Sequence, residues 1–220
     1  MKIICPLCGL VPLHNVTIYN DGLRKQKSSL SPILPTCNVC VSEVEVKSDT
    51  RGVKILLLNG TCGSGKSSTA EELVKSHGFA AIDGDNAMRI VESKLGERRV
   101  GFESPEFLEE ITKEIDILSA VGRKIVISTV VEKEIQQYKN IFESKGMDYR
   151  IILLKPSYEV AVKRTQTRTC FTSVTPEVWV RHFYDALNCE GVDVFDNSDL
   201  SVEQSAVEIL QLAFGRNFSV

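Results

Sequence analysis

The segment from Gly60 to Ser67 carries the residue types and spacing best suited to chemistry. It reads Gly-Thr-Cys-Gly-Ser-Gly-Lys-Ser and matches the pattern G-x-x-x-x-G-K-[ST] in full. Glycines let the chain turn tightly, so that successive backbone N–H groups point inward at phosphate oxygens, and the helix expected next adds the positive end of its dipole. Lys66 can reach the terminal phosphates, and the Ser67 hydroxyl can ligate Mg²⁺.

The sequence therefore predicts a site for ATP with Mg²⁺. A glycine-rich loop without a ligand is disfavoured, because an apolar run precedes the motif and an amphipathic stretch follows it. The residues expected to contact the nucleotide are Gly60, Thr61, Cys62, Gly63, Ser64, Gly65, Lys66, Ser67 and Ser68.

A second polar stretch runs from Asp83 to Arg89 and follows a short apolar run. A carboxylate at the end of a strand can orient or deprotonate a hydroxyl and help to hold Mg²⁺ through water. Asp85 and Arg89 are four residues apart, which places them on one helical face where they could bind a polar acceptor. The spacing does not separate Asp83 from Asp85 as the base. The alternative is a helix-capping aspartate with a solvated ion pair.

The two motifs together, from Ile55 to Arg89, resemble the P-loop kinase-like enzymes, among them adenylylsulfate, gluconate and polynucleotide kinases. The stretch Asp-Gly-Asp-Asn-Ala-Met-Arg is similar to the D-G-D-N-x-x-R stretch of that group. In adenylylsulfate kinases the arginine usually comes one residue earlier, where this chain has Met88, which argues against that substrate. The resemblance implies transfer of the γ-phosphoryl group of ATP to a hydroxyl of a small-molecule acceptor.

The resemblance also extends to later landmarks. The run from Lys163 to Arg168 looks like the lid of these kinases and makes Arg164 and Arg168 candidates for stabilising transferred charge; a solvated basic helix end is the alternative. Residues 126–129 resemble the third strand but lack a terminal aspartate, which leaves Mg²⁺ to Ser67 and an aspartate of the Asp-Gly-Asp stretch. Residues 194–198 resemble the loop that borders adenine through its backbone.

The acceptor pocket is expected between the helix that starts near Asp85 and the helix that starts at Pro105. Arg98 and Arg99 lie in the connecting segment, where they meet an anionic acceptor or are simply solvated. Trp179 and His182 are three residues apart on one expected helix, a spacing most often found in core or rim packing.

Four cysteines form two pairs, Cys5/Cys8 and Cys37/Cys40, separated by 28 residues. Two C-x-x-C pairs joined by a hairpin are typical of a zinc ribbon with a closed, structural tetrathiolate site. About fifty residues build little core, so Zn²⁺ binding would supply folding energy. A redox dithiol and unrelated buried cysteines are the alternatives.

The elements that must position these residues alternate from Val53 onward. Apolar strands are expected at 53–59, 79–83, 124–129, 149–154 and 192–195. Helices are expected at 67–77, 86–95, 105–121, after the third strand to about 143, and at 158–167, 176–188 and 202–214. Apolar strands flanked by helices indicate a parallel sheet covered on both faces. The resemblance to the P-loop kinase-like enzymes implies a three-layer α/β/α sandwich with strand order 2-3-1-4-5 in residues 51–220. A ribbon domain in residues 1–50 is expected to precede it.

Composition fits an ordinary globular chain: 220 residues, 43% hydrophobic, 25% charged and a net charge of −3. No apolar run is long enough for a membrane helix and no secretory signal pattern is present, so a cytoplasmic location without membrane contact is the expectation. Residues 1–51 carry six Lys or Arg against four Asp or Glu, and the remainder 20 against 25.

Three rival functions stay open at this point. The first is a polynucleotide 5′-hydroxyl kinase that contacts nucleic acid through its zinc ribbon, although the acidic balance of the second domain speaks against it. The second is a non-enzymatic ATP-binding interaction protein. The third is a toxin-like kinase that acts on a sugar nucleotide.

Overall fold

The computed structural model describes side chains and backbone for residues 53–96, 101–119, 124–133, 135–167, 175–187 and 190–215. In residues 1–50 it describes only the backbone of four short strands. β1 (Lys2–Cys5) pairs antiparallel with β2 (Gly9–Pro12), and β3 (Val16–Thr17) pairs antiparallel with β4 (Thr36–Cys37).

The predicted zinc ligands fall in this N-terminal part. Cys5 ends β1 and Cys37 ends β4, whereas Cys8 and Cys40 lie outside the described residues. No side chain of these cysteines is described, so the tetrathiolate site stays a prediction.

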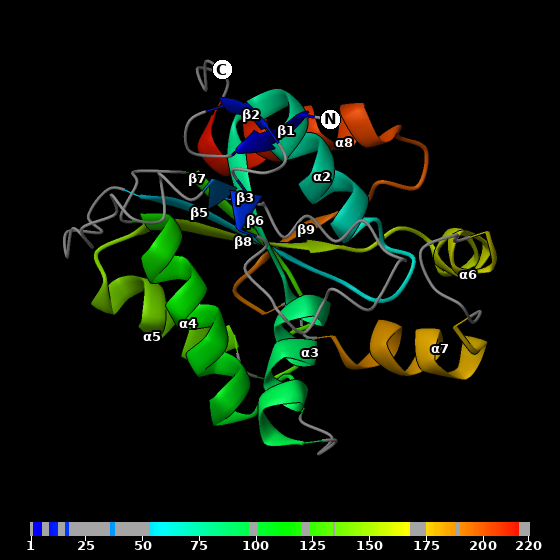
Figure 1. Cartoon of the computed structure of the whole chain (residues 1–220). Helices are drawn as coiled ribbons and strands as arrows, with labels where there is room; N and C mark the ends of the chain where they lie inside the picture. Colours follow the sequence, from blue (N-terminus) through cyan, green and yellow to red (C-terminus); the bar gives the residue numbers. More distant parts are fainter. Residues whose placement is uncertain are drawn as a thin grey trace.

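The centre of the molecule is one parallel sheet (Figure 1). Its strands are β5 (Lys54–Asn59), β6 (Phe79–Asp83), β7 (Lys124–Ser128), β8 (Asp148–Leu154) and β9 (Asp193–Phe195). They lie in the order β6-β7-β5-β8-β9, which confirms the predicted order 2-3-1-4-5. Residues 55–58 of the central strand β5 form an uninterrupted apolar run because both faces of the strand are covered, which is the usual condition of a parallel sheet.

Helices cover both faces of the sheet. They are α2 (Lys66–His77), α3 (Gly84–Leu95), α4 (Pro105–Ser119), α5 (Ile135–Ser144), α6 (Tyr158–Gln166), α7 (Glu177–Ala186) and α8 (Val202–Phe214). None of the described helices is long and apolar enough to cross a membrane.

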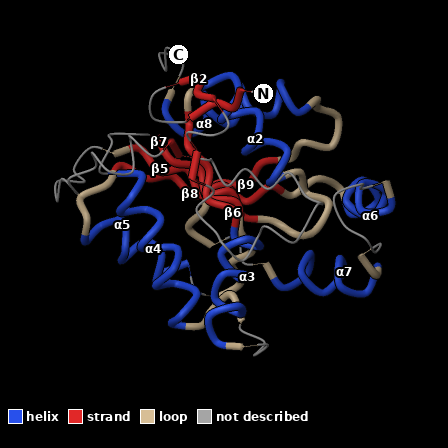
Figure 2. The backbone as a smooth tube through the Cα atoms, viewed as in Figure 1, coloured by secondary structure: helices blue, strands red, loops and turns tan. Residues whose placement is uncertain are grey.

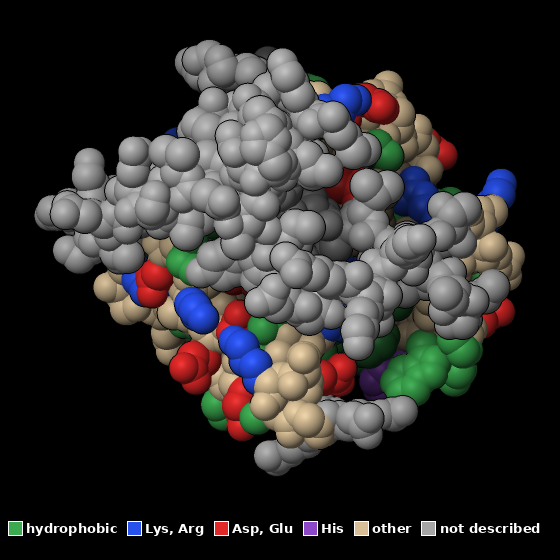
Figure 3. Space-filling model, viewed as in Figure 1, with side chains coloured by type: hydrophobic (Ala, Val, Ile, Leu, Met, Phe, Trp, Pro, Cys, Tyr) green, Lys and Arg blue, Asp and Glu red, His purple; other side chains and the backbone are tan. Residues whose placement is uncertain are grey.

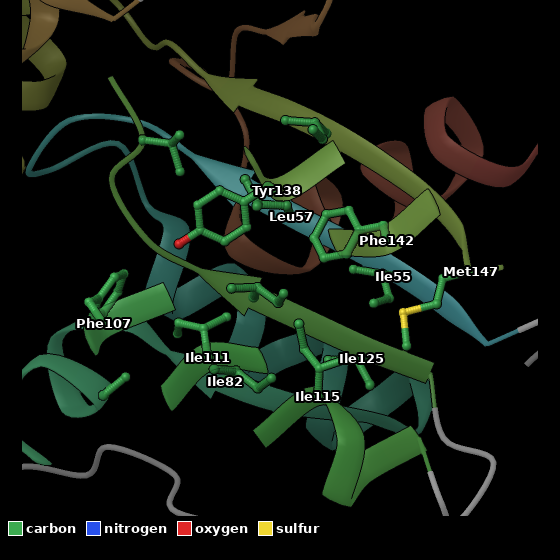
Figure 4. Close-up of a cluster of buried hydrophobic side chains, with 14 of the residues drawn as sticks. Ile55, Leu57, Ile82, Phe107, Ile111, Ile115, Ile125, Tyr138, Phe142 and Met147 are labelled. Atoms are coloured by element: carbon green, nitrogen blue, oxygen red, sulfur yellow. The ribbon is translucent and has the colours of Figure 1, made fainter. Parts of the chain in front are cut away.

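Two buried clusters hold the layers together. Side chains alternate between the faces of a strand, so Ile55 and Leu57 pack on one side and Leu56 and Leu58 on the other. The first side meets α4 and α5, where aromatic and branched side chains interdigitate (Figure 4). The second side meets α2 and α8 through Leu73, Ile209 and Leu210, among others. The three-layer α/β/α sandwich expected from the sequence is confirmed.

The helix starts reflect local capping. Ser104 Oγ accepts a hydrogen bond from Phe107 N at 3.1 Å, so Ser104 caps α4 as its position before Pro105 predicts. α8 begins with a reciprocal capping box between Ser201 and Gln204. α3 starts at Gly84, two residues earlier than expected, because Asp83 rather than a later residue is its N-cap.

Candidate active site

The carboxyl ends of β5, β6 and β7 meet at one edge of the sheet, the place where open α/β folds bind ligands. Asp83 at the end of β6 is the register partner of Ser128 at the end of β7, and Leu58 of β5 pairs with Ser128 from the other side. Residues far apart in the sequence therefore converge on the loop that follows β5.

That loop is the Gly60–Ser67 segment, and its glycines are required by its geometry. Gly63 and Gly65 have φ angles of 79° and 96°, in the left-handed region that other residues rarely adopt. A Cβ on Gly63 would collide with the carbonyl oxygen of Ala161 in α6, and one on Gly60 would lie 2.6 Å from the Leu154 carbonyl oxygen. The tight turn closes with Ser64 N donating to Thr61 O at 3.2 Å.

The loop concentrates positive charge. Lys66 Nζ donates to the carbonyl oxygens of Gly60 and Thr61 at 2.6 and 3.1 Å, which holds the ammonium group across the start of the loop. α2 starts directly behind it, with no side chain capping its N-terminus and no acidic residue in its first turn. The amide groups at the start of α2 therefore suit an anionic ligand.

Oxygen ligands lie next to the loop. Ser67 Oγ is 3.5 Å from Ser128 Oγ, and Asp83 follows at the end of the neighbouring strand. Asp83 Oδ1 accepts a hydrogen bond from Asn86 N at 3.0 Å. Burial and then the charge of Asp85 raise the pKa of Asp83, with Arg89 among the groups that oppose this. A cation at this edge would relieve both effects.

Asp85 differs from Asp83 in its surroundings. It is exposed in the first turn of α3, where it complements the helix dipole. Arg89 is half-buried one turn further on. Within the described part of the chain, these two side chains make no ion pair with each other. The solvated ion pair considered as an alternative is therefore not formed, and the capping role belongs to Asp83.

Arg164 reaches the loop from α6. Its Nη2 donates to the Asn197 carbonyl oxygen at 2.9 Å and its Nη1 to Asn197 Oδ1 at 3.4 Å. Asn197 Nδ2 in turn donates to Ser64 O at 3.0 Å. Burial lowers the pKa of the Arg164 guanidinium group, against the influence of Asp196. Arg168, Arg98 and Arg99 lie outside the described residues.

Two asparagines contribute side-chain contacts that the sequence did not predict: Asn59, which lies in no motif, and Asn197, for which only backbone contacts were expected. Asn59 is fully buried; its Oδ1 accepts from Gly60 N at 2.8 Å and Val131 N at 2.9 Å, and its Nδ2 donates to Val131 O at 2.7 Å. It thereby joins the start of the phosphate loop to the segment after β7. The available signal was a polar residue that ends an otherwise apolar strand.

Several buried polar atoms at this edge have no hydrogen-bond partner among the described residues: Ser64 Oγ, Asn86 Oδ1 and Thr129 Oγ1. Buried polar groups in native proteins are nearly always paired, and leaving one unpaired costs free energy. Three such atoms around the loop and the start of α3 mark the edge as a place where a ligand or its waters complete the structure.

The helix α7 borders the same loop. Thr61 Oγ1 donates to the Val180 carbonyl oxygen at 3.2 Å. Trp179, beside Val180, is 54% exposed and its ring packs against His182 and Phe183, so of the two expected placements, core or rim, the structure shows the rim. Cys62 is a partly exposed free thiol, and Ser68 is exposed on α2.

The sheet order and the phosphate loop together define a P-loop kinase fold. The chain belongs to the AAA domain family, whose model matches residues 56–170. This segment runs from β5 through the phosphate loop to α6.

Solved structures agree with the fold assignment at low sequence identity. The tunicamycin resistance protein of Deinococcus radiodurans is 16% identical with a TM-score of 0.58, over 74% of this chain and 96% of that one. A sugar kinase from Janibacter sp. is 17% identical with a TM-score of 0.56, over 77% and 99%. The Mycobacterium tuberculosis APS kinase CysC is 18% identical with a TM-score of 0.53, over 74% and 98%. No curated protein matches the chain in sequence.

Proposed function

We propose that the chain is an ATP- and Mg²⁺-dependent phosphotransferase that transfers the γ-phosphoryl group to a hydroxyl of a small-molecule acceptor. The observation that carries the proposal is the convergence at one sheet edge of Lys66, Arg164 and the uncapped start of α2. Asp83 at the end of β6 and Asp85 in the first turn of α3 lie at the same edge. Kinase chemistry needs such an arrangement, because phosphoryl transfer depends mainly on positioning and on stabilising charge. The sugar kinase and APS kinase among the structural neighbours support it.

The cationic groups hold the phosphates. The backbone amides of the loop and Lys66 bind the terminal phosphates, for which the ammonium group leaves its bonds to Gly60 and Thr61. Arg164 lies beside the loop, with Nη1 3.9 Å from where a Cβ on Gly65 would be. Arginine suits charge that is spread over several phosphate oxygens, because its planar fork donates to more than one of them. Arg168 is proposed to act from the same side.

The oxygen donors fit Mg²⁺. Ser67 would ligate the ion directly and Asp83 through water, since hydroxyl and carboxylate oxygens are the ligands that this hard cation prefers. When bound, Mg²⁺ neutralises charge on the phosphate oxygens. Asp83 suits a supporting role because one carboxylate oxygen is already committed to capping α3.

We assign the base to Asp85, because it is exposed and its carboxylate is not committed to capping α3. The acceptor oxygen attacks the γ-phosphorus, and the bond between that phosphorus and the β,γ-bridging oxygen breaks, so that ADP leaves. The hydroxyl proton passes to Asp85. Arg89, one helical turn away, would orient the acceptor.

The test is an ATP-consumption screen over hydroxyl-bearing metabolites, nucleosides and oligonucleotides. Lys66→Ala is expected to lower turnover by about 100-fold or more, since removing one preorganised charge donor typically costs this much. Asp85→Asn is expected to abolish turnover while ADP still binds, whereas Asp83→Asn raises the Mg²⁺ concentration required. Equal ATP consumption by wild type and Lys66→Ala would refute the proposal, and ATP binding without turnover against the whole panel would favour an interaction protein. Oligonucleotide turnover with a steep salt dependence would favour a polynucleotide kinase.

We further propose that residues 1–50 hold one structural Zn²⁺ through Cys5, Cys8, Cys37 and Cys40. The support is the spacing of the pairs and the position of Cys5 and Cys37 at the ends of paired strands. Elemental analysis of the purified chain is expected to give one zinc per chain, lost in a Cys5→Ser/Cys37→Ser variant. A metal-free wild type would reject this assignment.

A further inference from the structure

Trp179 is the single tryptophan of the chain and it lies on the surface. It is 54% exposed, and the neighbouring Val178 is 70% exposed. Hydrophobic side chains gather on the surface over α7, beside a histidine (Figure 3). An aromatic side chain of this size usually buries most of its area, so a helix that presents it to solvent commonly uses it for binding.

The indole ring belongs to a row of aromatic rings. Trp179 and Phe183 lie one helical turn apart with ring centroids 6.2 Å apart and planes 26° from parallel. His182 packs edge-on against both, at 6.2 Å from Trp179 and 5.2 Å from Phe183. The His182 ring stands at 85° to the indole plane, so the three rings are not coplanar. Its contact and that of Phe183 restrict the rotation of the indole ring, so Trp179 presents a fixed aromatic surface.

The opposite flank of α7 is held to α6 (Figure 2). The Arg181 guanidinium group lies over the Tyr158 ring at 4.2 Å, and Tyr158 Oη donates to Glu177 at 2.8 Å. Tyr184 Oη donates to the Pro156 carbonyl oxygen at 3.0 Å. α7 is therefore anchored along one flank, whereas Trp179 on its other flank is exposed.

Trp179 lies next to the part of the phosphate loop that would hold the terminal phosphates. Lys66, which reaches the terminal phosphates in this motif, is held at the carbonyl oxygens of Gly60 and Thr61. Thr61 Oγ1 also bonds to the Val180 carbonyl oxygen. Trp179 is therefore the immediate neighbour of the α7 residue that contacts the phosphate loop, on the side of the loop where the terminal phosphates would bind.

We infer that the exposed indole ring of Trp179, held in place by His182 and Phe183, stacks against a planar ring of the acceptor, and that the acceptor is a nucleoside or nucleotide. This inference rests on the proposed function. A nucleoside joins a flat base to a sugar that carries the hydroxyl to be phosphorylated. This matches an exposed indole ring next to the part of the phosphate loop that would hold the terminal phosphates. Loss of such a stacking ring typically weakens the binding of a base by about 5- to 150-fold. The His182 ring nitrogens add a donor or an acceptor for its edge.

Because Trp179 is the only tryptophan, its fluorescence reports on this surface directly. The full chain is first saturated with Mg²⁺ and ADP to fill the donor site. It is then titrated with adenosine, guanosine, cytidine and uridine, and separately with gluconate and glucose. A saturable loss of emission with at least one nucleoside, and none with the non-aromatic polyols, is the expected result.

Variants test the role of the ring itself by equilibrium dialysis of the nucleoside that quenches best. Trp179→Leu, which keeps an apolar side chain but no ring, is expected to weaken binding about tenfold or more, and Trp179→Phe is expected to retain most of it. Val178→Ala, on the same helix and more exposed, is the matched control and should stay within about twofold of wild type.

Three outcomes overturn the inference: emission that responds to polyols but to no nucleoside, emission that responds to neither, or a change that follows protein concentration and therefore reports self-association. Its failure is separable from failure of the proposed function. Turnover of a non-aromatic acceptor with unchanged emission refutes the inference alone, whereas nucleoside quenching without any ATP turnover refutes only the kinase assignment.

Discussion

Replacing Asn59 by alanine removes the side chain that fixes the start of the phosphate loop. The fully buried amide group forms three hydrogen bonds, to Gly60 N, Val131 N and Val131 O, at 2.7–2.9 Å. Asn59→Ala leaves these three backbone groups without their partner. A buried group that loses its partner costs about 1–1.5 kcal/mol or more, so the free energy of unfolding should fall by roughly 3–4 kcal/mol.

The assay is urea unfolding followed by far-ultraviolet circular dichroism and by Trp179 fluorescence. Asn140→Ala is the matched control, because Asn140 is exposed on α5 and its side chain only accepts from Gln136 Nε2; a surface bond of this kind contributes less than about 0.5 kcal/mol. ADP affinity should also fall in Asn59→Ala, since Gly60 is no longer tethered. A loss below about 1 kcal/mol, comparable with Asn140→Ala, would refute the reasoning.

Three further substitutions follow from the geometry. Burial and the charges of Glu110 and Asp83 raise the pKa of Glu114 to about 7. The folded protein therefore holds this proton more tightly than the unfolded chain, and the free energy of unfolding falls as pH rises from about 4.5 to 7. Glu114→Gln should remove that pH dependence and gain on the order of 1–2 kcal/mol at pH 8 in urea titrations. Gly63→Ala forces a Cβ into the Ala161 carbonyl oxygen at a positive φ, so we expect loss of ATP binding in calorimetry together with a loss of about 1–3 kcal/mol in stability. Thr129→Val removes a buried hydroxyl that has no partner among the described residues, so the ligand-free protein should gain about 1 kcal/mol while turnover falls.

Each of these has a clear opposing result. A stability profile of Glu114→Gln parallel to that of wild type between pH 4.5 and 8 would show that this carboxyl group does not control the slope. Full ATP affinity in Gly63→Ala would mean that the loop and α6 are not packed as described. Thr129→Val with reduced stability would show that the hydroxyl is already satisfied.

The strands and helices could be predicted because their signals are local and repeated, whereas the strand order followed from the resemblance to the P-loop kinase-like enzymes. Apolar runs such as that of β5 alternate with helical stretches, and the phosphate loop fixes which strand is the first. The α8 boundaries, Val202 to Phe214, follow from a capping serine and a periodic apolar face. Nothing in these features requires knowledge of distant partners.

The side-chain contacts that hold the phosphate loop could not be predicted, because they join residues that are far apart in the sequence. Asn59 bonds to a residue 72 positions away, and Asn197 to one 133 positions away. Asn59 forms part of no motif, and the stretch 194–198 that contains Asn197 predicts only backbone contacts. The exposure of Trp179 likewise depends on which flank of α7 packs against α6, a tertiary choice that the three-residue spacing to His182 does not encode. The distinction between Asp83 and Asp85 became visible only once the N-cap of α3 was known.

The supports of the phosphate loop extend beyond the segment that carries its motif. The family match ends at residue 170, yet Ser64 is braced by Asn197 and Thr61 by the helix around Val180. A fragment trimmed to residues 56–170 would keep every motif residue up to Arg168. It would lose the hydrogen bonds that join Ser64 to Asn197 and Thr61 to Val180. The smallest fragment expected to bind a nucleotide therefore extends beyond β9. Truncations designed from the motif alone are expected to lose nucleotide binding.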